Sequence, residues 1–390
     1  MTENKELFYY DQVLEIEQFC NFSSEKEYLL KAIENGECTK LYGPRNFGKT
    51  SLARNIVAKI WEAKNIDKRV VVYADLYSVT DLNDLSLELT KAFTKALNSK
   101  KNILDKGLEW LKVFKNIRPA WTPSSMSDGL GEFSLTTEKS EQIINFQIIL
   151  ENIHHLQKSG KFEFLIIFDE FQEIHKIKRA EALLRSSLQF FSIKIPVIIL
   201  GSKQHLLKDI FESPRAPFYS WGNTIEFHPI PFKEYHSYIE ERFSSLKMTH
   251  SLETSIFLQT KMNRIPESIN RFCSYLCKTN SEKEITIVTI ENELQQFVDR
   301  SRSIYEHIFS NLSSSERKII ETISKNEKIT QVLGKDFLSS LKDVSKSTVS
   351  NVVHKLLDQA ILSQGIDEMN KKYFWITDPF FNYFVKHYKI

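Results

Sequence analysis

Residues 43–50 read Gly-Pro-Arg-Asn-Phe-Gly-Lys-Thr, which is the complete G-x-x-x-x-G-K-[ST] pattern of a phosphate-binding loop. A short strand is predicted for residues 39–42 and a helix from residue 50 onward, so the motif has the strand–loop–helix setting that its mechanism needs. Glycine lets the backbone approach phosphate closely, and the N–H groups at the start of the helix attract the anion. The expected ligand is therefore a nucleoside triphosphate with Mg²⁺; the alternative is a glycine-rich turn with a chance lysine.

Each position of this loop has an expected contact. We expect Lys49 to reach the β- and γ-phosphates, which also places it among the catalytic residues, and the Thr50 hydroxyl to ligate Mg²⁺. Further nucleotide contacts are expected from the rest of the loop and the first helical turn, namely Gly43, Pro44, Arg45, Asn46, Phe47, Gly48 and Ser51.

A second motif supplies carboxylates. Residues 164–170 read Phe-Leu-Ile-Ile-Phe-Asp-Glu, and such a continuous apolar run is typical of a central parallel strand covered on both faces. Asp169 would then lie at the carboxyl edge of the sheet as the second Mg²⁺ contact. Glu170 can orient and deprotonate an attacking water. The alternative is a strand that simply ends in exposed acids.

A further strand is predicted at residues 196–200, and Gly201-Ser202-Lys203 follow it. A polar side chain at this point lies between the two motifs, so Ser202 is expected to sense the γ-phosphate or to position the water. The alternative is that Ser202 only caps the next helix.

The order of predicted elements indicates the fold class. Strands alternate with helices up to about residue 227, which predicts an α/β fold with a parallel sheet. Short strands around a Ser/Gly-rich turn predict a β-hairpin inserted at about residues 118–137. Residues 232–298 have only helical periodicity, as a small helical lid would. From residue 304 the predicted order is three helices and then two strands.

Composition excludes some classes of protein. Hydrophobic residues make up 42% of the 390 residues and charged residues 26%, which is ordinary globular composition. The net charge of +2 gives no global polycation, so any nucleic-acid binding must rest on a local surface. Residues 1–8 lack the apolar region of a signal peptide, and the apolar runs are far below a membrane span of about 20 residues. We therefore expect a cytoplasmic protein that does not bind membranes.

The cysteines do not predict a metal site. Cys273 and Cys277 would share a helical face, but no second Cys or His pair follows at zinc-ligand spacing. We expect these two, with Cys20 and Cys38, to be reduced thiols.

Several further segments accompany these motifs along nearly the whole chain. They are Phe22-Ser-Ser-Glu-Lys-Glu-Tyr-Leu29, Leu41 to Leu52 around the phosphate loop, Phe168-Asp-Glu-Phe-Gln172, Gly201-Ser202, Ala216-Pro-Phe-Tyr219, Pro229-Ile-Pro-Phe232, Arg264-Ile-Pro266 and Ile376-Thr-Asp-Pro-Phe380. In these segments the chain resembles the archaeal-type ATPases, in the STAND branch of the AAA+-related P-loop NTPases. The Asp-Glu-Phe-Gln and Thr-Asp-Pro-Phe pieces are the most specific.

The resemblance implies a domain organisation. An α/β nucleotide-binding domain would occupy residues 1–230, a helical lid residues 231–300 and a winged-helix domain residues 301–390. It implies ATP rather than GTP, because the chain lacks a guanine-reading Asn-Lys-x-Asp. Pro266 matches the family's lid proline, which lies close to the nucleotide base.

The chain departs from the family pattern at two places. Ser24 stands where the family usually has Arg, and Ser220-Trp221 stand where it tends to carry Arg after the Pro-Phe-Tyr motif. Arg215, four residues before Tyr219, is the candidate that would replace this arginine as an arginine finger.

The C-terminal segment fits the winged helix in detail. The predicted helices are Ser313–Lys325, Lys335–Lys342 and Ser345–Gln359, and the predicted wing strands are Ala360–Ile366 and Lys372–Thr377. The polar face of the third helix offers Lys346, Ser347, Asn351 and Lys355 as candidate contacts to double-stranded DNA. Residues 301–390 hold 13 basic and 10 acidic residues, and a net charge of +3 is a weak footprint for DNA. Docking on a protein, either a partner or another part of the chain, is the alternative.

Three functions fit these observations. The leading one is an ATP-dependent switch that couples nucleotide state to the winged helix. The second is an ATPase that loads or remodels DNA, resembling replication initiators or transposition regulators. The third is a binding module that holds ATP without hydrolysing it, with Glu170 idle.

Overall fold

The computed structural model describes residues 7–20, 22–100, 120–122, 132–134, 139–189, 195–279, 283–326, 329–341, 344–366 and 371–388. The chain forms two units. The first comprises Ser23–Gly43 and Lys49–Phe227, and the second comprises the segment before Ser23, the loop tip Pro44–Gly48 and His228–Ile390.

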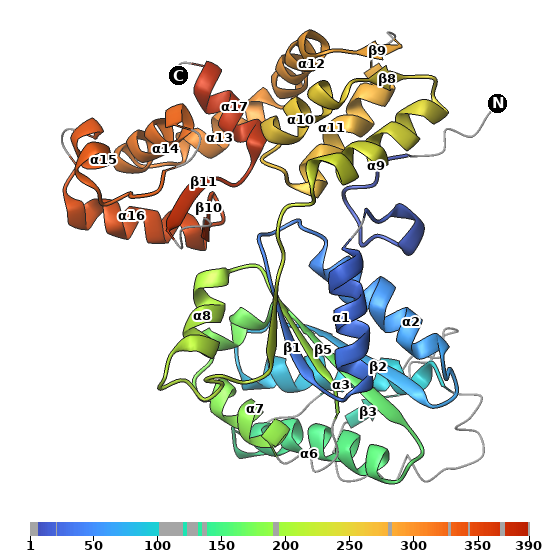
Figure 1. Cartoon of the computed structure of the whole chain (residues 1–390). Helices are drawn as coiled ribbons and strands as arrows, with labels where there is room; N and C mark the ends of the chain where they lie inside the picture. Colours follow the sequence, from blue (N-terminus) through green and yellow to red (C-terminus); the bar gives the residue numbers. More distant parts are fainter. Residues whose placement is uncertain are drawn as a thin grey trace. The chain divides into compact units, whose positions relative to one another are not determined.

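The first unit is built on five parallel strands in the order β2-β5-β6-β1-β7 (Figure 1). The strands are β1 (Cys38–Tyr42), β2 (Arg69–Asp75), β5 (Glu163–Asp169), β6 (Val197–Gly201) and β7 (Asn223–Glu226). The predicted α/β fold with a parallel sheet is confirmed.

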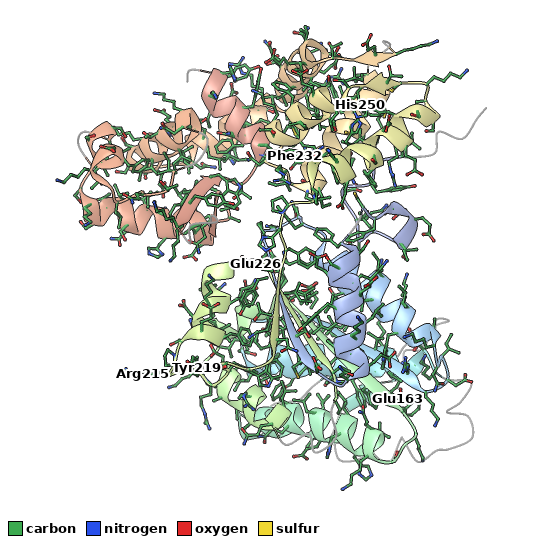
Figure 2. The ribbon with its side chains drawn as sticks, viewed as in Figure 1. Glu163, Arg215, Tyr219, Glu226, Phe232 and His250 are labelled. Atoms are coloured by element: carbon green, nitrogen blue, oxygen red, sulfur yellow. The ribbon has the colours of Figure 1, made fainter. Side chains whose placement is uncertain are left out.

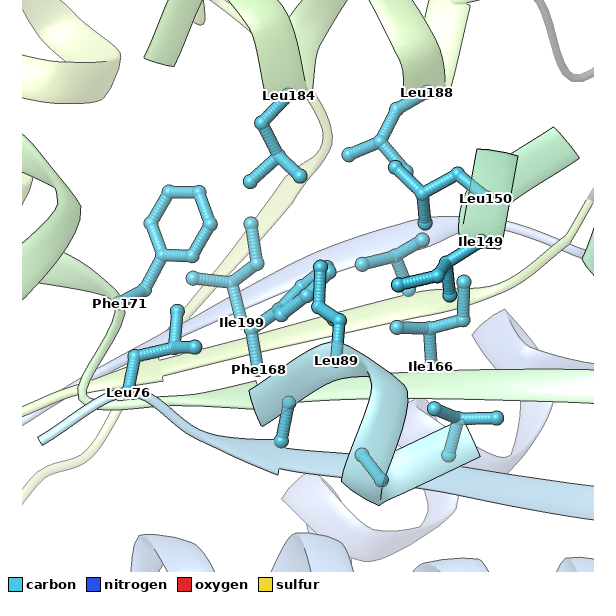
Figure 3. Packing of buried hydrophobic residues seen from close by; sticks show 14 of the residues in the cluster. Leu76, Leu89, Ile149, Leu150, Ile166, Phe168, Phe171, Leu184, Leu188 and Ile199 are labelled. Carbon is cyan, nitrogen blue, oxygen red and sulfur yellow. The ribbon is translucent and has the colours of Figure 1, made fainter. Parts of the chain in front are cut away.

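Helices cover both faces of this sheet. They are α1 (Ser23–Glu34), a π-helical segment η2 (Ser51–Val57) that continues as α2 (Ala58–Ala63), α3 (Leu82–Asn98), α6 (Lys139–Lys158), η3 (Phe171–Lys176), α7 (Ala180–Gln189) and α8 (Gln204–Glu212). A hydrophobic core cluster joins β2, β5 and β6 to α3, α6 and α7 through side chains such as Leu89, Ile149, Ile166 and Leu184 (Figure 3). Because β5 and β6 are covered on both sides, their residues from 164 to 169 and from 197 to 201 are all buried. This burial explains the continuous apolar runs in the sequence.

The predicted inserted hairpin lies mostly outside the described residues. Its strands β3 (Ala120–Thr122) and β4 (Glu132–Ser134) are described as backbone, and they pair in antiparallel fashion.

The second unit contains a helical lid. Its helices are α9 (Phe232–Ser245), α10 (Leu252–Lys261), α11 (Pro266–Thr279) and α12 (Ile287–Arg300). The prediction of helices alone was incomplete here, because β8 (Thr249–His250) pairs with β9 (Glu284–Ile285) in parallel. The chain's first described residues pack on this lid: Phe8 is fully buried against the rings of Tyr238 and Phe243.

The C-terminal part of the same unit has winged-helix topology. Its elements are α13 (Arg302–Ser310), α14 (Ser314–Asn326), α15 (Lys335–Ser340), α16 (Lys346–Asp358), β10 (Leu362–Ile366), β11 (Lys372–Ile376) and α17 (Pro379–His387). β10 and β11 form the antiparallel wing, and an isolated bridge between Ile329 and Phe374 adds to its edge. Ser345 caps α16 by accepting a hydrogen bond from the Thr348 N–H at 3.1 Å. The three predicted helices and two predicted strands correspond to α14, α15, α16, β10 and β11, but the flanking helices α13 and α17 were not predicted.

Within the described ranges, no helix is both long and apolar enough to cross a membrane. All four cysteines are free thiols, and Cys273 is buried in α11.

A histidine pair lies in the lid between α9 and β8. His236 Nδ1 and His250 Nε2 are 3.2 Å apart, and His250 Nδ1 is buried with no hydrogen-bond partner in the part of the chain that the structure describes. Burial, and then the neighbouring His236, lower the pKa of His250 to about 4, while Glu240 opposes the shift.

This histidine predicts loss of stability in acid. An unfolded histidine has a pKa of about 6.5, so below that pH the unfolded chain binds a proton that the folded lid excludes down to about pH 4. The midpoint temperature of thermal unfolding should therefore decrease as the pH is lowered from 7 to 5. His250→Phe should make that decrease smaller. Replacing His354, an exposed histidine of α16, should leave it unchanged. An equal decrease in wild type and His250→Phe would contradict this origin.

Candidate functional site

The phosphate loop follows β1 directly and leads into the helix that begins at Lys49. Two of its residues have left-handed backbone, Asn46 with φ of 66° and Gly48 with φ of 81°. Asparagine and glycine are the residues that adopt this region most readily. The sequence therefore suits the sharp turn that presents the loop's N–H groups at the carboxyl end of β1.

Lys49 is a buried cation, 7% exposed, and its Nζ donates to the carbonyl of Gly43 at 2.9 Å. This bond folds the lysine side chain back along the inside of its own loop. A buried ammonium group needs negative charge or strong acceptors, and triphosphate oxygens supply both. The position fits the predicted role of Lys49 in binding phosphate.

Asp169 lies at the end of β5, where a group of donors surrounds its carboxylate. The Thr50 hydroxyl donates to Oδ2 at 2.7 Å, the Tyr73 hydroxyl donates to the same oxygen at 2.9 Å, and the Glu170 N–H donates to Oδ1 at 2.9 Å. Burial raises the pKa of Asp169, and the hydrogen bonds from Thr50 and Tyr73 oppose that rise. A hydroxyl and a carboxylate in contact are hard oxygen ligands of the kind Mg²⁺ prefers. The predicted pair, Thr50 and Asp169, therefore fits the metal.

Glu170 turns away from the line of the strand. Its backbone is left-handed, with φ of 50° and ψ of 42°, and it starts the short helix η3. Its Oε2 accepts hydrogen bonds from the Ser202 hydroxyl at 2.8 Å and from the Gln172 side-chain amide. The three strand-end residues expected from sequence, Asp169, Glu170 and Ser202, thus lie together at one edge of the sheet.

The contact of Ser202 bears on its two predicted roles. α8 begins at Gln204 with Lys203 at its cap position, and among the described side chains no hydrogen bond caps it. The Ser202 hydroxyl instead contacts the Glu170 carboxylate. This arrangement favours the role of Ser202 in the nucleotide site over the role of a helix cap.

Arg215 and Tyr219 are exposed on the segment between α8 and β7 (Figure 2). This segment precedes β7, whereas the phosphate loop follows β1, and the two strands are parallel neighbours. Arg215 therefore lies toward the amino ends of the strands, away from the loop of its own chain. Its role as an arginine finger stays a prediction.

Pro266 is the first residue of α11 in the lid, and its carbonyl accepts a hydrogen bond from the Tyr235 hydroxyl at 3.2 Å. Its expected place near the nucleotide base stays a prediction.

The candidate DNA contacts on α16 are all exposed, but they are not equivalent. Lys346, Ser347 and Asn351 face solvent. Lys355 instead pairs with Glu316 of α14 at 2.7 Å. Although burial opposes it, hydrogen bonds from Lys355 and Ser313 lower the pKa of Glu316, so the lysine serves to neutralise a buried carboxylate. Lys355 therefore differs from the other three candidates in its ion pair with Glu316, and DNA contact by all four stays a prediction.

Residues 19–256 match the family model of an ATPase domain found predominantly in Archaea. The chain belongs to this ATPase family. Residues 303–387 match the model of a probable winged helix domain, in agreement with the topology of this part of the chain. A comparison with curated proteins finds no match.

Solved structures agree on the fold of this ATPase. The Walker-type ATPase PABY2304 of Pyrococcus abyssi is 15% identical with a TM-score of 0.61, over 97% of this chain and 99% of that one. The Aeropyrum pernix ORC2 protein, solved as ADPNP–ADP complexes, is 13% identical with a TM-score of 0.54, over 97% and 94%. The ORC1 protein of the same organism, solved with DNA, is 11% identical with a TM-score of 0.50, over 94% and 91%. At these identities the similarity establishes the fold.

Two residues of the ATPase site escaped sequence reasoning. Tyr73, on β2, contacts Asp169 and stacks under the Arg54 guanidinium at 4.4 Å. Gln172 contacts Glu170 and was noted only as part of a family motif. The strand register could have identified Tyr73. Asp75 pairs with Asp169 across adjacent strands, and Tyr73 pairs with Ile167, two residues earlier on each strand.

Lys49→Ala tests the phosphate loop. A charge-assisted hydrogen bond is worth about 1.5–3 kcal/mol, so the variant should bind ATP–Mg²⁺ roughly tenfold or more weakly. Calorimetric titration measures the affinity, and circular dichroism confirms the fold. An unchanged affinity in a folded variant would rule out the assigned role of Lys49.

Proposed function

We propose that this ATPase hydrolyses ATP with Mg²⁺ and uses the nucleotide state to control its winged-helix domain. The observation that carries the proposal is the position of Glu170 beside Asp169, with its carboxylate held by Ser202. A carboxylate next to the magnesium ligand is placed to take a proton from water.

The residues of the site divide the work of hydrolysis. Lys49 neutralises charge on the β- and γ-phosphates, and Thr50 and Asp169 would hold Mg²⁺, which supplies further neutralisation of phosphate charge when bound. Glu170 accepts the proton of the attacking water and so aligns the water with the γ-phosphate. Ser202 fixes one oxygen of Glu170, which leaves the other oxygen to receive the proton. ATP rather than GTP is the proposed substrate, because the chain has no Asn-Lys-x-Asp motif.

Contacts within the second unit support the coupling to the winged helix. The Arg271 guanidinium of lid helix α11 lies 5.3 Å from the ring of Phe297 and 5.2 Å from the ring of Phe380 in α17. The Asn263 side-chain amide, also in the lid, donates to the carbonyl of Ile376 at the end of the wing at 3.3 Å. Lid and winged helix are therefore packed together, so a lid that responds to nucleotide would carry the winged helix with it.

Glu170→Gln tests this function. The amide keeps the shape of the side chain but cannot accept the proton, so hydrolysis should slow by roughly 10²–10⁴-fold while ATP–Mg²⁺ affinity stays the same. Single-turnover assays and calorimetry measure the two quantities. Turnover equal to that of the wild type would show that Glu170 is not the base. A wild-type chain that binds ATP without turnover would support the third function, a non-hydrolysing module.

A DNA-loading or remodelling ATPase is the second candidate. The exposed start of α16, with Lys346, Ser347 and Asn351, supports it. The fold is also similar to that of the A. pernix ORC1 protein, which was solved with DNA. The weak charge of the winged helix supports docking on protein instead, and self-association would give Arg215 a nucleotide site to enter.

Salt dependence of duplex binding separates these two candidates. A protein that neutralises phosphates loses affinity with salt at a slope near −0.9 per contact. Lys346→Ala should flatten that slope by roughly one unit and leave ATP binding unchanged, since Lys346 faces solvent. Lys355→Ala should instead lower the unfolding midpoint, because it leaves the buried Glu316 carboxylate without its cationic partner.

Fluorescence anisotropy with random duplex, with and without ATP, measures the slope. Lys325→Ala on α14 is the matched control, an exposed lysine that should not alter it. Absence of binding at micromolar protein in both nucleotide states would leave protein docking as the role of the winged helix.

A further inference from the structure

Gln172 lies in the turn that follows β5, with no exposed surface at all. Its side-chain amide donates to Oε2 of Glu170, the same oxygen that accepts the Ser202 hydroxyl at 2.8 Å. The hydrogen bonds that this carboxylate accepts from described residues therefore converge on one oxygen. Its other oxygen, Oε1, is left to accept a proton from water.

The backbone around Glu170 makes this hold specific. Glu170 has φ of 50° and ψ of 42°, a left-handed conformation that is unfavourable for a residue with a Cβ. Such a residue persists where its surroundings determine it, and this commonly occurs at functional sites. Phe171 and Ile174 are fully buried in the same short helix and anchor it in the core. The Gln172 amide is thus fixed relative to the sheet, and Glu170 is held against it.

Packing alone does not explain a glutamine at position 172. The amide oxygen of Gln172 is buried with no hydrogen-bond partner among the described residues, which destabilises the fold. The same oxygen lies so close to Gly201 that a Cβ at residue 201 would collide with it and with Leu207. A methionine at 172 would fill a similar volume and would bury no orphan acceptor. The contact that only the glutamine can make is the donation to Glu170.

We propose that Gln172 is a positioning residue for ATP hydrolysis, which orients the Glu170 carboxylate so that Oε1 meets the attacking water. This inference rests on the proposed function of Glu170 as the base. Gln172 contacts neither water nor phosphate in this role and acts through Glu170 alone. Ser202 cannot replace it, because one hydroxyl leaves the carboxylate free to rotate about that single bond.

The test is Gln172→Met in the full chain, in the wild-type and Glu170→Gln backgrounds. A misplaced catalytic group costs up to roughly 10²-fold in rate, so kcat should fall by about 10- to 100-fold while the Kd for ATP–Mg²⁺ changes by less than about twofold. Because Gln172 acts through Glu170, Gln172→Met should cause no further loss when Glu170→Gln is already present. Single-turnover hydrolysis and calorimetric titration measure these quantities.

Gln157→Met is the matched control. Gln157 is a glutamine of the same unit whose side-chain oxygen accepts the Phe164 N–H at 2.8 Å, toward the opposite end of β5. Gln157→Met should leave kcat unchanged even where it lowers the unfolding midpoint. A loss of kcat in Gln172→Met would then not be an effect of general destabilisation. Gly201→Ala, which displaces Gln172, should reproduce the loss of kcat.

The outcomes distinguish the two proposals. The positioning role is overturned if the wild type hydrolyses ATP and Gln172→Met hydrolyses it at the same rate. It is also overturned if Gln172→Met lowers the rate equally in the wild-type and Glu170→Gln backgrounds. Both outcomes leave the base assignment intact. Equal turnover in wild type and Glu170→Gln overturns the base assignment, and the positioning role falls with it.

Discussion

The hydrogen bond between Thr50 and Asp169 joins residues 119 apart in sequence, and the site depends on it. It forms because β1, β6 and β5 are parallel neighbours whose carboxyl ends meet at one edge of the sheet. Tyr42 pairs with Gly201 and Phe168 pairs with Ile199 in this register. The residues that follow the three strands are thereby brought together: the phosphate loop, Ser202, and Asp169 with Glu170. A slip of one residue in β5 would turn Asp169 toward the opposite face.

The same edge concentrates buried charge. Lys49 and Asp169 are both nearly excluded from water, and burial raises the pKa of Asp169. The fold offsets this cost with donors from three directions, Thr50, Tyr73 and the Glu170 N–H. Those donors also fix the carboxylate, so its geometry is set before any ligand arrives. Preorganised polar groups of this kind stabilise a transition state without reorganising at the moment of reaction.

The sequence was sufficient to predict elements whose structure follows from a local residue pattern. Continuous apolar runs exist because β5 and β6 are covered on both faces, and the loop motif needs specific residues at fixed spacing. It was insufficient for contacts set by tertiary packing. Lys355 and Glu316 pair across two different helices, and the hydrophobic periodicity of each helix does not predict a contact between them. The two-residue strands β8 and β9 are too short for an alternating pattern. The role of Gln172 could not be predicted, because its amide contacts the Glu170 carboxylate only through the left-handed turn at Glu170.

The winged helix is packed on the lid and does not form an independent module. Its last helix begins at the Thr-Asp-Pro-Phe motif, where Asp378 accepts the N–H groups of Phe380 and Phe381 at 2.8 and 3.3 Å. This cap fixes Phe380 among Arg271, Phe272 and Phe297 of the lid. The specific motif thus serves the junction between lid and winged helix, not the exposed face of α16. Because Lys355 is also committed to Glu316, mechanical coupling to the lid is better supported in this chain than charge complementarity to DNA.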